Sequence, residues 1–220
     1  PVLSKAFQSK NYSKITNIQN QSLELSLLLS VPASIGLIIA SEEIVNGLFG
    51  YGSFNIKDVE MTSKALMFFG YGVIAFSLIK IFANFYFARD NTITPFYISS
   101  LIVFLNVTIS ISFFNKLGFL IIPLATSIST WIGVLIFLCL LLKNNLLVLQ
   151  SRLFKNTFKI LISSLIMVVA LAYALNKYSS YLDYTYTFKS VYLLTIVGFV
   201  GTIYLLSCYL FGLLKIKNYK

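Results

Sequence analysis

GFLIIPLATSISTWIGVLIFLCLLL, residues 118–142, is a run of 25 residues without a charged side chain. A hydrocarbon core about 30 Å thick needs about 20 apolar residues of helix, so this run is long enough to cross a bilayer. Five other runs resemble it, and the period-2 pattern of a barrel strand is absent. The sequence therefore predicts an all-α, polytopic helical membrane protein with six transmembrane helices. The expected spans are Leu23–Ala40, Ala65–Ala88, Ile93–Phe114, Gly118–Leu142, Phe158–Leu175 and Val191–Leu214.

The composition supports this fold class. Hydrophobic residues make up 58% of the 220 residues and charged residues 11%, whereas a soluble domain has about 25% charged residues. A mean hydropathy of +0.85 leaves no room for a large soluble domain. The formal net charge of +10 does not indicate nucleic-acid binding, because the lysines other than Lys80 lie in or next to the gaps between apolar runs rather than on one globular face.

The positive charges predict the orientation of the chain. Eleven of the 17 Lys and Arg residues fall on the side that holds residues 1–22, and five fall on the other side. Positive charge accumulates on the cytoplasmic side, so we expect both ends to be cytoplasmic. Because the chain opens on Pro1 rather than Met, we also expect an upstream part. The expected regions are a cytoplasmic interfacial segment at 1–22, four transmembrane helices within 23–142, a cytoplasmic loop at 143–157, and a terminal helix pair with a cytoplasmic tail at 158–220.

Polar side chains inside apolar spans are costly unless they face protein or water, so they are the best candidates for functional residues. Lys80 lies about eight residues, or about 12 Å, from the predicted cytoplasmic end of the second span. Ser77, Lys80 and Asn84 are spaced at i, i+3 and i+7 and share one helix face. We predict that they line an aqueous substrate cavity that receives an anionic group. A lysine whose amine reaches the interface, or is paired within the protein, is the alternative.

A second set of polar residues lies on the third and fourth spans. Asn106 and Ser110 share one face of the third span, and Thr126 and Thr130 share one face of the fourth. In one interpretation the two spans pack on each other through these residues, because small polar side chains allow membrane helices to approach closely. In the other, the oxygens of Asn106 and Thr126 form a polar or cation site. Neither face carries a carboxylate, which does not favour tight cation binding.

The sequence lacks the residues of common catalytic and metal sites. It contains no histidine, so a Ser–His pair, a Cys–His pair and a His-based metal site are all excluded. It also contains no Walker A pattern. We therefore expect neither an enzyme nor a bound cofactor or metal. The energy for any transport is expected to come from outside these residues or from an ion gradient or the membrane potential.

Five segments carry a resemblance to a known family. They are PVLSKAF at 1–7, VPASIGL at 31–37, LFGYGSF at 48–54, FYFARDNTITP at 85–95 and LGFLIIPLATSISTWI at 117–132. In this order and spacing the chain resembles the C-terminal part of the MurJ (MviN) lipid II flippases, members of the multidrug/oligosaccharidyl-lipid/polysaccharide exporter superfamily. The third segment is similar to the family's LFxxGxF loop and the fourth to its FYAxxDTxTP turn. The resemblance covers essentially the whole chain and is weaker after residue 145.

The resemblance implies that the six spans correspond to helices nine to fourteen of a fourteen-helix flippase. Residues 23–142 would complete the second lobe around a central cationic cavity, and the terminal pair would hold the polyprenyl tail of the substrate. The substrate would be lipid II, an undecaprenyl-diphosphate-linked peptidoglycan precursor, moved across the bacterial inner membrane by alternating access. Lys80 would provide a cationic partner for the diphosphate. The expected partners are thus membrane lipids and this lipid-linked substrate.

The chain departs from the family pattern in the cytoplasmic turn formed by Arg89, Asp90 and Asn91, because Asn91 stands where the family has aspartate. The charged residues on which the family depends lie in its first, second and eighth helices, which match no residue of this chain. Two alternatives remain. One is another exporter of the superfamily, for polysaccharide-linked lipids or drugs, and the other is a non-transporting membrane scaffold subunit.

Overall fold

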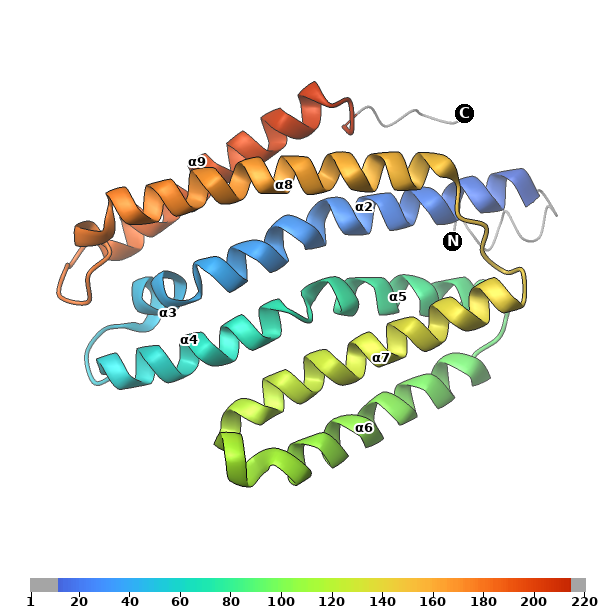
Figure 1. Ribbon diagram of the computed structural model, residues 1–220, viewed down its shortest axis with the longest axis horizontal. Coiled ribbons are helices and arrows are strands. Elements are labelled where there is room, and N and C mark those ends of the chain that lie inside the picture. The colour runs from blue at the N-terminus through green and yellow to red at the C-terminus, as the bar shows by residue number, and fades with distance from the viewer. Residues whose placement is uncertain (1–11, 215–220) are drawn as a thin grey trace. The chain divides into compact units, whose positions relative to one another are not determined.

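The computed structural model describes residues 12–214, and every regular element within them is a helix. Figure 1 labels these helices along the chain, from blue near the N-terminus to red near the C-terminus. They are α2 (Tyr12–Ile39), α3 (Ser41–Phe49), α4 (Ile56–Gly70), α5 (Val73–Phe87), α6 (Ile93–Leu117), the 3₁₀ turn η1 (Gly118–Leu120), α7 (Ile121–Lys143), α8 (Ser151–Lys177), the 3₁₀ turn η2 (Ser179–Tyr181) and α9 (Lys189–Leu210).

Five segments of the described residues are long and apolar enough to cross a membrane. The longest, Ile93–Lys143, contains two helices, because the chain reverses between α6 and α7 at η1. Gly118 begins this turn with a φ of +57°, a conformation that glycine adopts without steric cost. Large apolar side chains such as Phe104 and Ile111 remain exposed on α6, as expected of a surface that contacts lipid. The prediction of an all-α membrane protein with six long apolar helices is confirmed.

Two helix boundaries in the structure differ from those predicted from the sequence. The expected second span consists of α4 and α5, which are separated at Tyr71 and Gly72. Helix α4 begins well before the expected start of this span, because Asn55 and Asp58 form a reciprocal capping box at its N-terminus. Helix α8 begins at Ser151, so only residues 144–150 of the expected loop are irregular.

At the N-terminal end, residues 12–22 form the first turns of α2 and continue directly into the first span. The rest of the expected interfacial segment, including PVLSKAF, falls in residues 1–11 and lies outside the described residues. The expected cytoplasmic tail at residues 215–220 also lies outside them.

The chain divides into two compact units. The first unit comprises Pro1–Ser30 and Gly72–Thr157, and the second comprises Val31–Tyr71 and Phe158–Lys220. Helices α2 and α8 therefore contribute residues to both units, whereas α5, α6 and α7 belong to the first and α3, α4 and α9 to the second.

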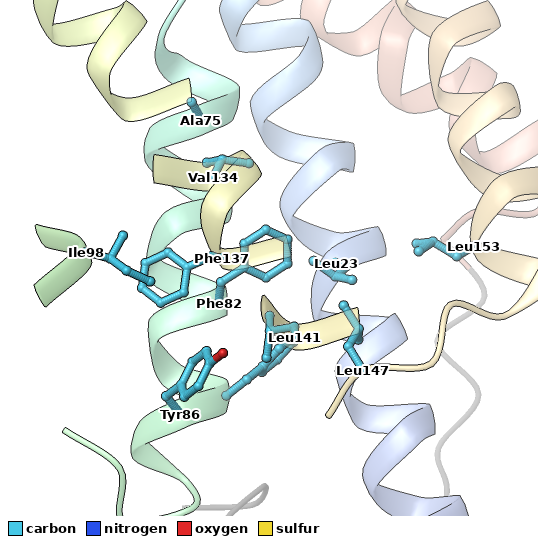
Figure 2. Packing of buried hydrophobic residues seen from close by; sticks show 11 residues of the cluster. Leu23, Ala75, Phe82, Tyr86, Ile98, Val134, Phe137, Leu141, Leu147 and Leu153 are labelled. Carbon is cyan, nitrogen blue, oxygen red and sulfur yellow. The ribbon is translucent and has the colours of Figure 1, made fainter. Parts of the chain in front are cut away.

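An aromatic cluster forms the core of the first unit (Figure 2). The rings of Phe82 and Tyr86 on α5 lie against Phe137 on α7, with centroid distances of 6.5 and 5.7 Å. Leu23 from α2 and Leu147 from the α7–α8 loop belong to the same buried cluster. Aromatic side chains bury the largest apolar areas, so this cluster fixes α5 on α7 and brings α2 and the loop to them.

The second unit is held by close helix contacts. Ser34 on α2 donates a hydrogen bond of 2.7 Å from its Oγ to the carbonyl oxygen of Gly70 on α4. Helix α3 approaches α9 at Gly47, where an added Cβ would lie 2.6 Å from Cδ2 of Leu193. Ser190 Oγ donates to the carbonyl oxygen of Gly47 at 2.6 Å. The approach of α3 and α9 thus depends on the absence of a side chain at Gly47.

Candidate functional site

The predicted cavity residues Ser77, Lys80 and Asn84 lie on α5 at the spacing of one helix face. The hydroxyl oxygens of Ser77 and of Ser26 on α2 are 2.7 Å apart, so a hydrogen bond links the two helices at this face. Ser26 is buried, whereas Lys80 and Asn84 are exposed. The first unit therefore presents an accessible amine and an accessible amide on one face of an otherwise apolar helix.

The polar residues of α6 and α7 meet each other. Asn106 Nδ2 donates to Thr126 Oγ1 at 2.8 Å, and Ser110 Oγ donates to Asn106 Oδ1 at 3.4 Å. Thr126 Oγ1 itself donates to the carbonyl oxygen of Ile122 at 2.7 Å, and Thr130 Oγ1 donates to that of Thr126 at 2.7 Å. The side-chain hydrogen bonds that join the two helices thus use the oxygens that a bound cation would need.

In the turn between α5 and α6, the Arg89 guanidinium binds backbone carbonyl groups. Its Nη1 donates to the carbonyl oxygen of Phe85 at 2.6 Å, and its Nη2 donates to that of Leu146 at 2.5 Å. Gln19 Nε2 on α2 donates to the same oxygen of Leu146 at 3.0 Å. Burial lowers the pKa of Arg89 from its ordinary value, but guanidinium remains charged at neutral pH because its ordinary pKa is so high. Arg89 therefore joins the turn to the α7–α8 loop.

The other two residues of this turn have different roles. Asn91 Oδ1 accepts a hydrogen bond of 3.0 Å from the backbone amide of Thr94 in the first turn of α6, whose N-cap residue is Thr92. An aspartate oxygen can accept the same hydrogen bond, so the departure from the family pattern at Asn91 leaves this contact intact. Asp90 is exposed and has a φ of +57°.

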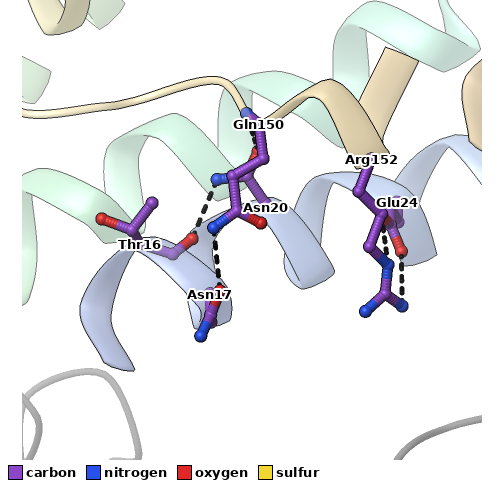
Figure 3. A network of polar contacts seen from close by, with 6 residues as sticks. All are labelled: Thr16, Asn17, Asn20, Glu24, Gln150 and Arg152. Carbon is purple, nitrogen blue, oxygen red and sulfur yellow. Dashed lines mark hydrogen bonds and ion pairs between the residues drawn. The ribbon is translucent and has the colours of Figure 1, made fainter. Parts of the chain in front are cut away.

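Buried amide side chains fasten the α7–α8 loop, residues 144–150, to α2 (Figure 3). Asn20 Nδ2 donates to the carbonyl oxygen of Val148 at 2.7 Å, and Asn20 Oδ1 accepts from the backbone amide of Gln150 at 3.0 Å. Gln150 Nε2 in turn donates to Asn17 Oδ1 at 2.8 Å. The loop is therefore a fixed part of the first unit.

In the second unit, Lys189 at the start of α9 is fully buried, with 0% of its surface exposed. Its Nζ donates to Asn46 Oδ1 at 3.1 Å and to the carbonyl oxygens of Gly50 and Tyr184, each at 2.6 Å. The rings of Tyr51 and Tyr184 have centroids 4.4 and 4.5 Å from the same nitrogen, within the range of cation–π attraction. We call Asn46, Gly50, Tyr51 and Tyr184 the ammonium cage.

Further hydrogen bonds hold the side chains of the cage in place. Asn46 Nδ2 donates to the carbonyl oxygen of Leu182 at 2.7 Å. The Tyr184 hydroxyl donates to the carbonyl oxygen of Phe54 at 2.6 Å, and the Tyr51 hydroxyl lies 2.6 Å from Ser190 Oγ. The LFGYGSF segment thus supplies two cage residues and one of their supports.

A cavity of about 290 Å³ lies beside the cage. Burial raises the pKa of Glu43 in its wall from the ordinary value. Hydrogen bonds from the backbone amide and hydroxyl of Thr185 lower the pKa of Asp183. Within residues 12–214 no three His, Cys, Asp or Glu side chains converge as a metal site. The lining residues are Glu42, Glu43, Asn46, Ile56, Val59, Leu175, Ser179, Leu182, Asp183 and Tyr184.

Sequence reasoning did not find the ammonium cage. It treated Lys189 as one of the charges between apolar runs, because a lysine next to tyrosines at the edge of a span is typical of a membrane interface. Two of its hydrogen-bond partners lie 143 and 139 residues earlier in the chain, so no local spacing connects them. The LFGYGSF segment was the one available signal.

Long apolar helices, with polar contacts confined to a few helix faces and ends, define a multi-pass helical membrane protein. The family described as "Lipid II flippase MurJ" matches residues 1–198. The chain therefore belongs to the MurJ family of lipid II flippases.

Individual relatives agree with this assignment. A probable lipid II flippase MurJ of Rhizobium tropici is 30% identical over 94% of this chain and 38% of its own length. One from Rickettsia prowazekii (strain Madrid E) is also 30% identical, over 100% of this chain and 43% of its own length. The solved structure titled "Lipid II flippase MurJ, inward closed conformation" has a TM-score of 0.76 and 28% identity over 96% of this chain and 41% of its own. The chain thus spans about two fifths of the relatives it matches.

Proposed function

We propose that the chain forms part of a lipid II flippase that moves the undecaprenyl-diphosphate-linked precursor across the bacterial inner membrane by alternating access. The observation that carries this proposal is the family match over residues 1–198, which extends over most of the chain. The likeness to a solved flippase over 96% of the chain supports it. Since the chain corresponds to about two fifths of its relatives, it supplies one portion of the translocation pathway.

Within that portion, Lys80 and Asn84 bind the charged head of the substrate. A lysine within an apolar helix is costly, and this cost is tolerated where the amine meets water or an anionic partner. The amine of Lys80 and the amide of Asn84 are both exposed on α5. An ammonium group forms strong, charge-assisted hydrogen bonds with phosphate oxygens. The hydrogen bond between Ser77 and Ser26 holds this face of α5 against α2.

The polar contact between α6 and α7 is, in this proposal, a helix-to-helix clamp rather than a cation site. Asn106 Oδ1 already accepts from Ser110, and Thr126 Oγ1 already accepts from Asn106. A cation would compete with these hydrogen bonds for the lone pairs of both oxygens. The energy for translocation then comes from an ion gradient or the membrane potential acting elsewhere in the transporter, and translocation itself makes and breaks no covalent bond.

The charge distribution of the sequence favours an orientation with both ends of the chain in the cytoplasm. In this orientation the Arg89 turn and the α7–α8 loop, which Arg89 joins through Leu146, lie at the cytoplasmic face. The ammonium cage and its neighbouring cavity lie at the opposite face. Scanning with single cysteines and a membrane-impermeant thiol reagent tests this: Asn145→Cys should be protected in intact cells and Ser53→Cys should react.

A complementation assay tests the function. The variants Lys80→Ala and Asn84→Ala, made in the full-length flippase, are expressed in cells depleted of their own lipid II flippase. Loss of one charge-assisted contact, about 1.5–3 kcal/mol, predicts at least about tenfold slower translocation by Lys80→Ala with normal membrane insertion. Lys64→Ala is the matched control, because Lys64 is exposed on α4 and pairs with Glu60 four residues earlier.

The outcome also separates the two alternatives. Normal growth with both Lys80→Ala and Asn84→Ala would contradict a cavity role for these residues. If the unmodified protein fails to support growth but exports another lipid-linked sugar or a drug, it is a different exporter of the superfamily. If the variants lose assembly with a partner while translocation continues, the chain belongs to a scaffold subunit.

A further inference from the structure

Lys189 is a buried cation whose contacts are all with uncharged groups. Among residues 12–214, no side-chain carboxylate forms an ion pair with Lys189 within 4.0 Å, and Asp183, whose pKa the Lys189 charge helps to lower, acts on it only through the longer-range electrostatic field. A buried charge is tolerated only where dipoles or counter-charges replace the lost water. Here two backbone carbonyl groups, one amide oxygen and two tyrosine rings replace it.

The number and type of these contacts match a protonated primary amine. An ammonium group has three N–H donors and no acceptor, and the cage offers three oxygens at 2.6–3.1 Å. The three oxygens and the negative faces of the two rings therefore complement the three donors and the positive charge of an ammonium group.

The backbone at Gly50 is adapted to this cage. Gly50 follows the last residue of α3, and its carbonyl group points at Lys189 Nζ. A Cβ on Gly50 would collide with both Oδ1 and the backbone oxygen of Asn46. Any larger residue would displace the amide that supplies the third acceptor, so two oxygens of the cage depend on this glycine.

The cage joins segments that are far apart in sequence. Asn46, Gly50 and Tyr51 belong to α3 and the turn after it, whereas Tyr184 and Lys189 belong to the end of the α8–α9 connection and the start of α9. The nearby contact between Gly47 and Leu193 needs these segments in register. A single ammonium group therefore holds both segments at one point.

We propose that Asn46, Gly50, Tyr51 and Tyr184 form an ammonium-binding site whose resident ligand is the Nζ of Lys189, and that Lys189 is the positioning residue that fixes α9 on α3. This site is separate from the α5 face that carries Lys80. The proposal concerns helix docking and does not depend on the identity of the transported substrate.

Chemical rescue of the Lys189→Ala variant tests the proposal. Propylammonium replaces the three carbons and the nitrogen that alanine lacks, so it should enter the vacated cage of the purified full-length protein. Amide hydrogen exchange should rise at least about tenfold over residues 46–54 and 182–190 in the variant and return towards the unmodified rate with propylammonium. Exchange over α6 and α7 should remain unchanged and reports that the variant is folded.

Two controls make the test specific. Tetramethylammonium carries the same charge without N–H donors, so it should not restore protection, because three of the five contacts are hydrogen bonds. Lys177→Ala removes another lysine that lies over tyrosine rings, at 5.7 and 5.9 Å, but this lysine is exposed. It should leave the exchange of residues 46–54 unchanged.

The proposal is overturned if Lys189→Ala exchanges like the unmodified protein, or if tetramethylammonium and propylammonium act equally. If Lys189→Ala also loses protection in α6 and α7, a pair of variants at Tyr51 decides instead. Tyr51→Phe keeps the ring face and removes only the hydroxyl contact with Ser190, whereas Tyr51→Leu removes the ring. Tyr51→Leu should raise exchange over residues 182–190 well above Tyr51→Phe, and equal exchange would contradict the cage.

Discussion

Lys80 of the first unit and Lys189 of the second are both lysines next to apolar helical sequence, yet their surroundings are opposite. Lys80 is exposed on α5, whereas Lys189 is fully buried with all three donors bonded. An amine whose donors are all bonded within the protein has none left for a ligand and therefore has a structural role. An accessible amine can bind a ligand. Hydropathy alone does not distinguish these cases, because it counts both residues as charges in or beside an apolar run.

Substitutions of the two lysines should differ most in their effect on the free energy of unfolding. Lys189→Met keeps an unbranched side chain that is one atom shorter, and it leaves three buried oxygens without a donor. Since an unsatisfied buried group costs about 1–3 kcal/mol, we expect the free energy of unfolding to fall by about 3 kcal/mol. Denaturant titration of the purified protein in detergent measures this. Lys80→Met should stay within about 0.5 kcal/mol of the unmodified protein, and equal losses for the two variants would contradict the comparison.

The close approach at Gly50 provides a second test of the cage. Gly50→Ala places a Cβ against the oxygens of Asn46, and overpacking of this kind costs about 1–3 kcal/mol. Its stability loss should therefore be about 2 kcal/mol. Gly36→Ala on α2 is the matched control, because nothing lies within 4 Å of its added Cβ. If both variants unfold at the same denaturant concentration, the backbone at Gly50 is not the constraint described here.

Lys80 should affect the rate of translocation rather than the stability of the protein. Lys80→Met should slow translocation about tenfold, which corresponds to about 1.4 kcal/mol, and Lys80→Arg should retain most of the rate because it keeps the positive charge. Flipping of a labelled lipid-linked substrate in proteoliposomes gives both rates. Equal flipping rates for Lys80→Met and Lys80→Arg would show that the positive charge does not matter and that Lys80 acts through packing.

The smallest expected effect is at the contact between α6 and α7. Thr126→Val preserves shape but removes the acceptor of Asn106 Nδ2. Hydrogen bonds between membrane helices average about 0.6 kcal/mol, so the loss should be about 0.6–1 kcal/mol in the same denaturant titration. The cation dependence of transport should not change. A shifted sodium dependence without loss of stability would instead assign these oxygens to a cation site.

Much of the fold could be predicted because its signals are local. The length of each apolar run predicts a spanning helix, and helical spacing places Asn106 and Ser110 on one face of α6 and Thr126 and Thr130 on one face of α7. The break between α4 and α5 was not predicted, since Tyr71 and Gly72 lie inside a continuous apolar run. The Gly70-Tyr71-Gly72 triplet is a local signal for this break, because glycine weakens a helix, but it interrupts the apolar run too briefly to end the predicted span.

The polar sites also contain some features that local spacing predicts and others that only helix packing creates. The shared face of Ser77, Lys80 and Asn84 follows from helical spacing alone, but its contact with Ser26 depends on packing between helices. The ammonium cage is the extreme case, because its acceptors are backbone carbonyl groups whose chemistry is identical at every residue. Only the fold decides that the oxygens of Gly50 and Tyr184 meet at one lysine.

The bonded α7–α8 loop has a practical consequence for labelling this protein. Its residues from Leu146 to Gln150 are tied to α2 through carbonyl and amide groups, so an epitope tag or fluorophore inserted there would detach the loop. Asn144 and Asn145 are exposed at the end of α7, and Asn145 already has a φ of +53°, which is typical of a turn. A reporter group joined at these two asparagines should leave the rest of the loop in place and make the movement of this end of the protein visible during a transport cycle.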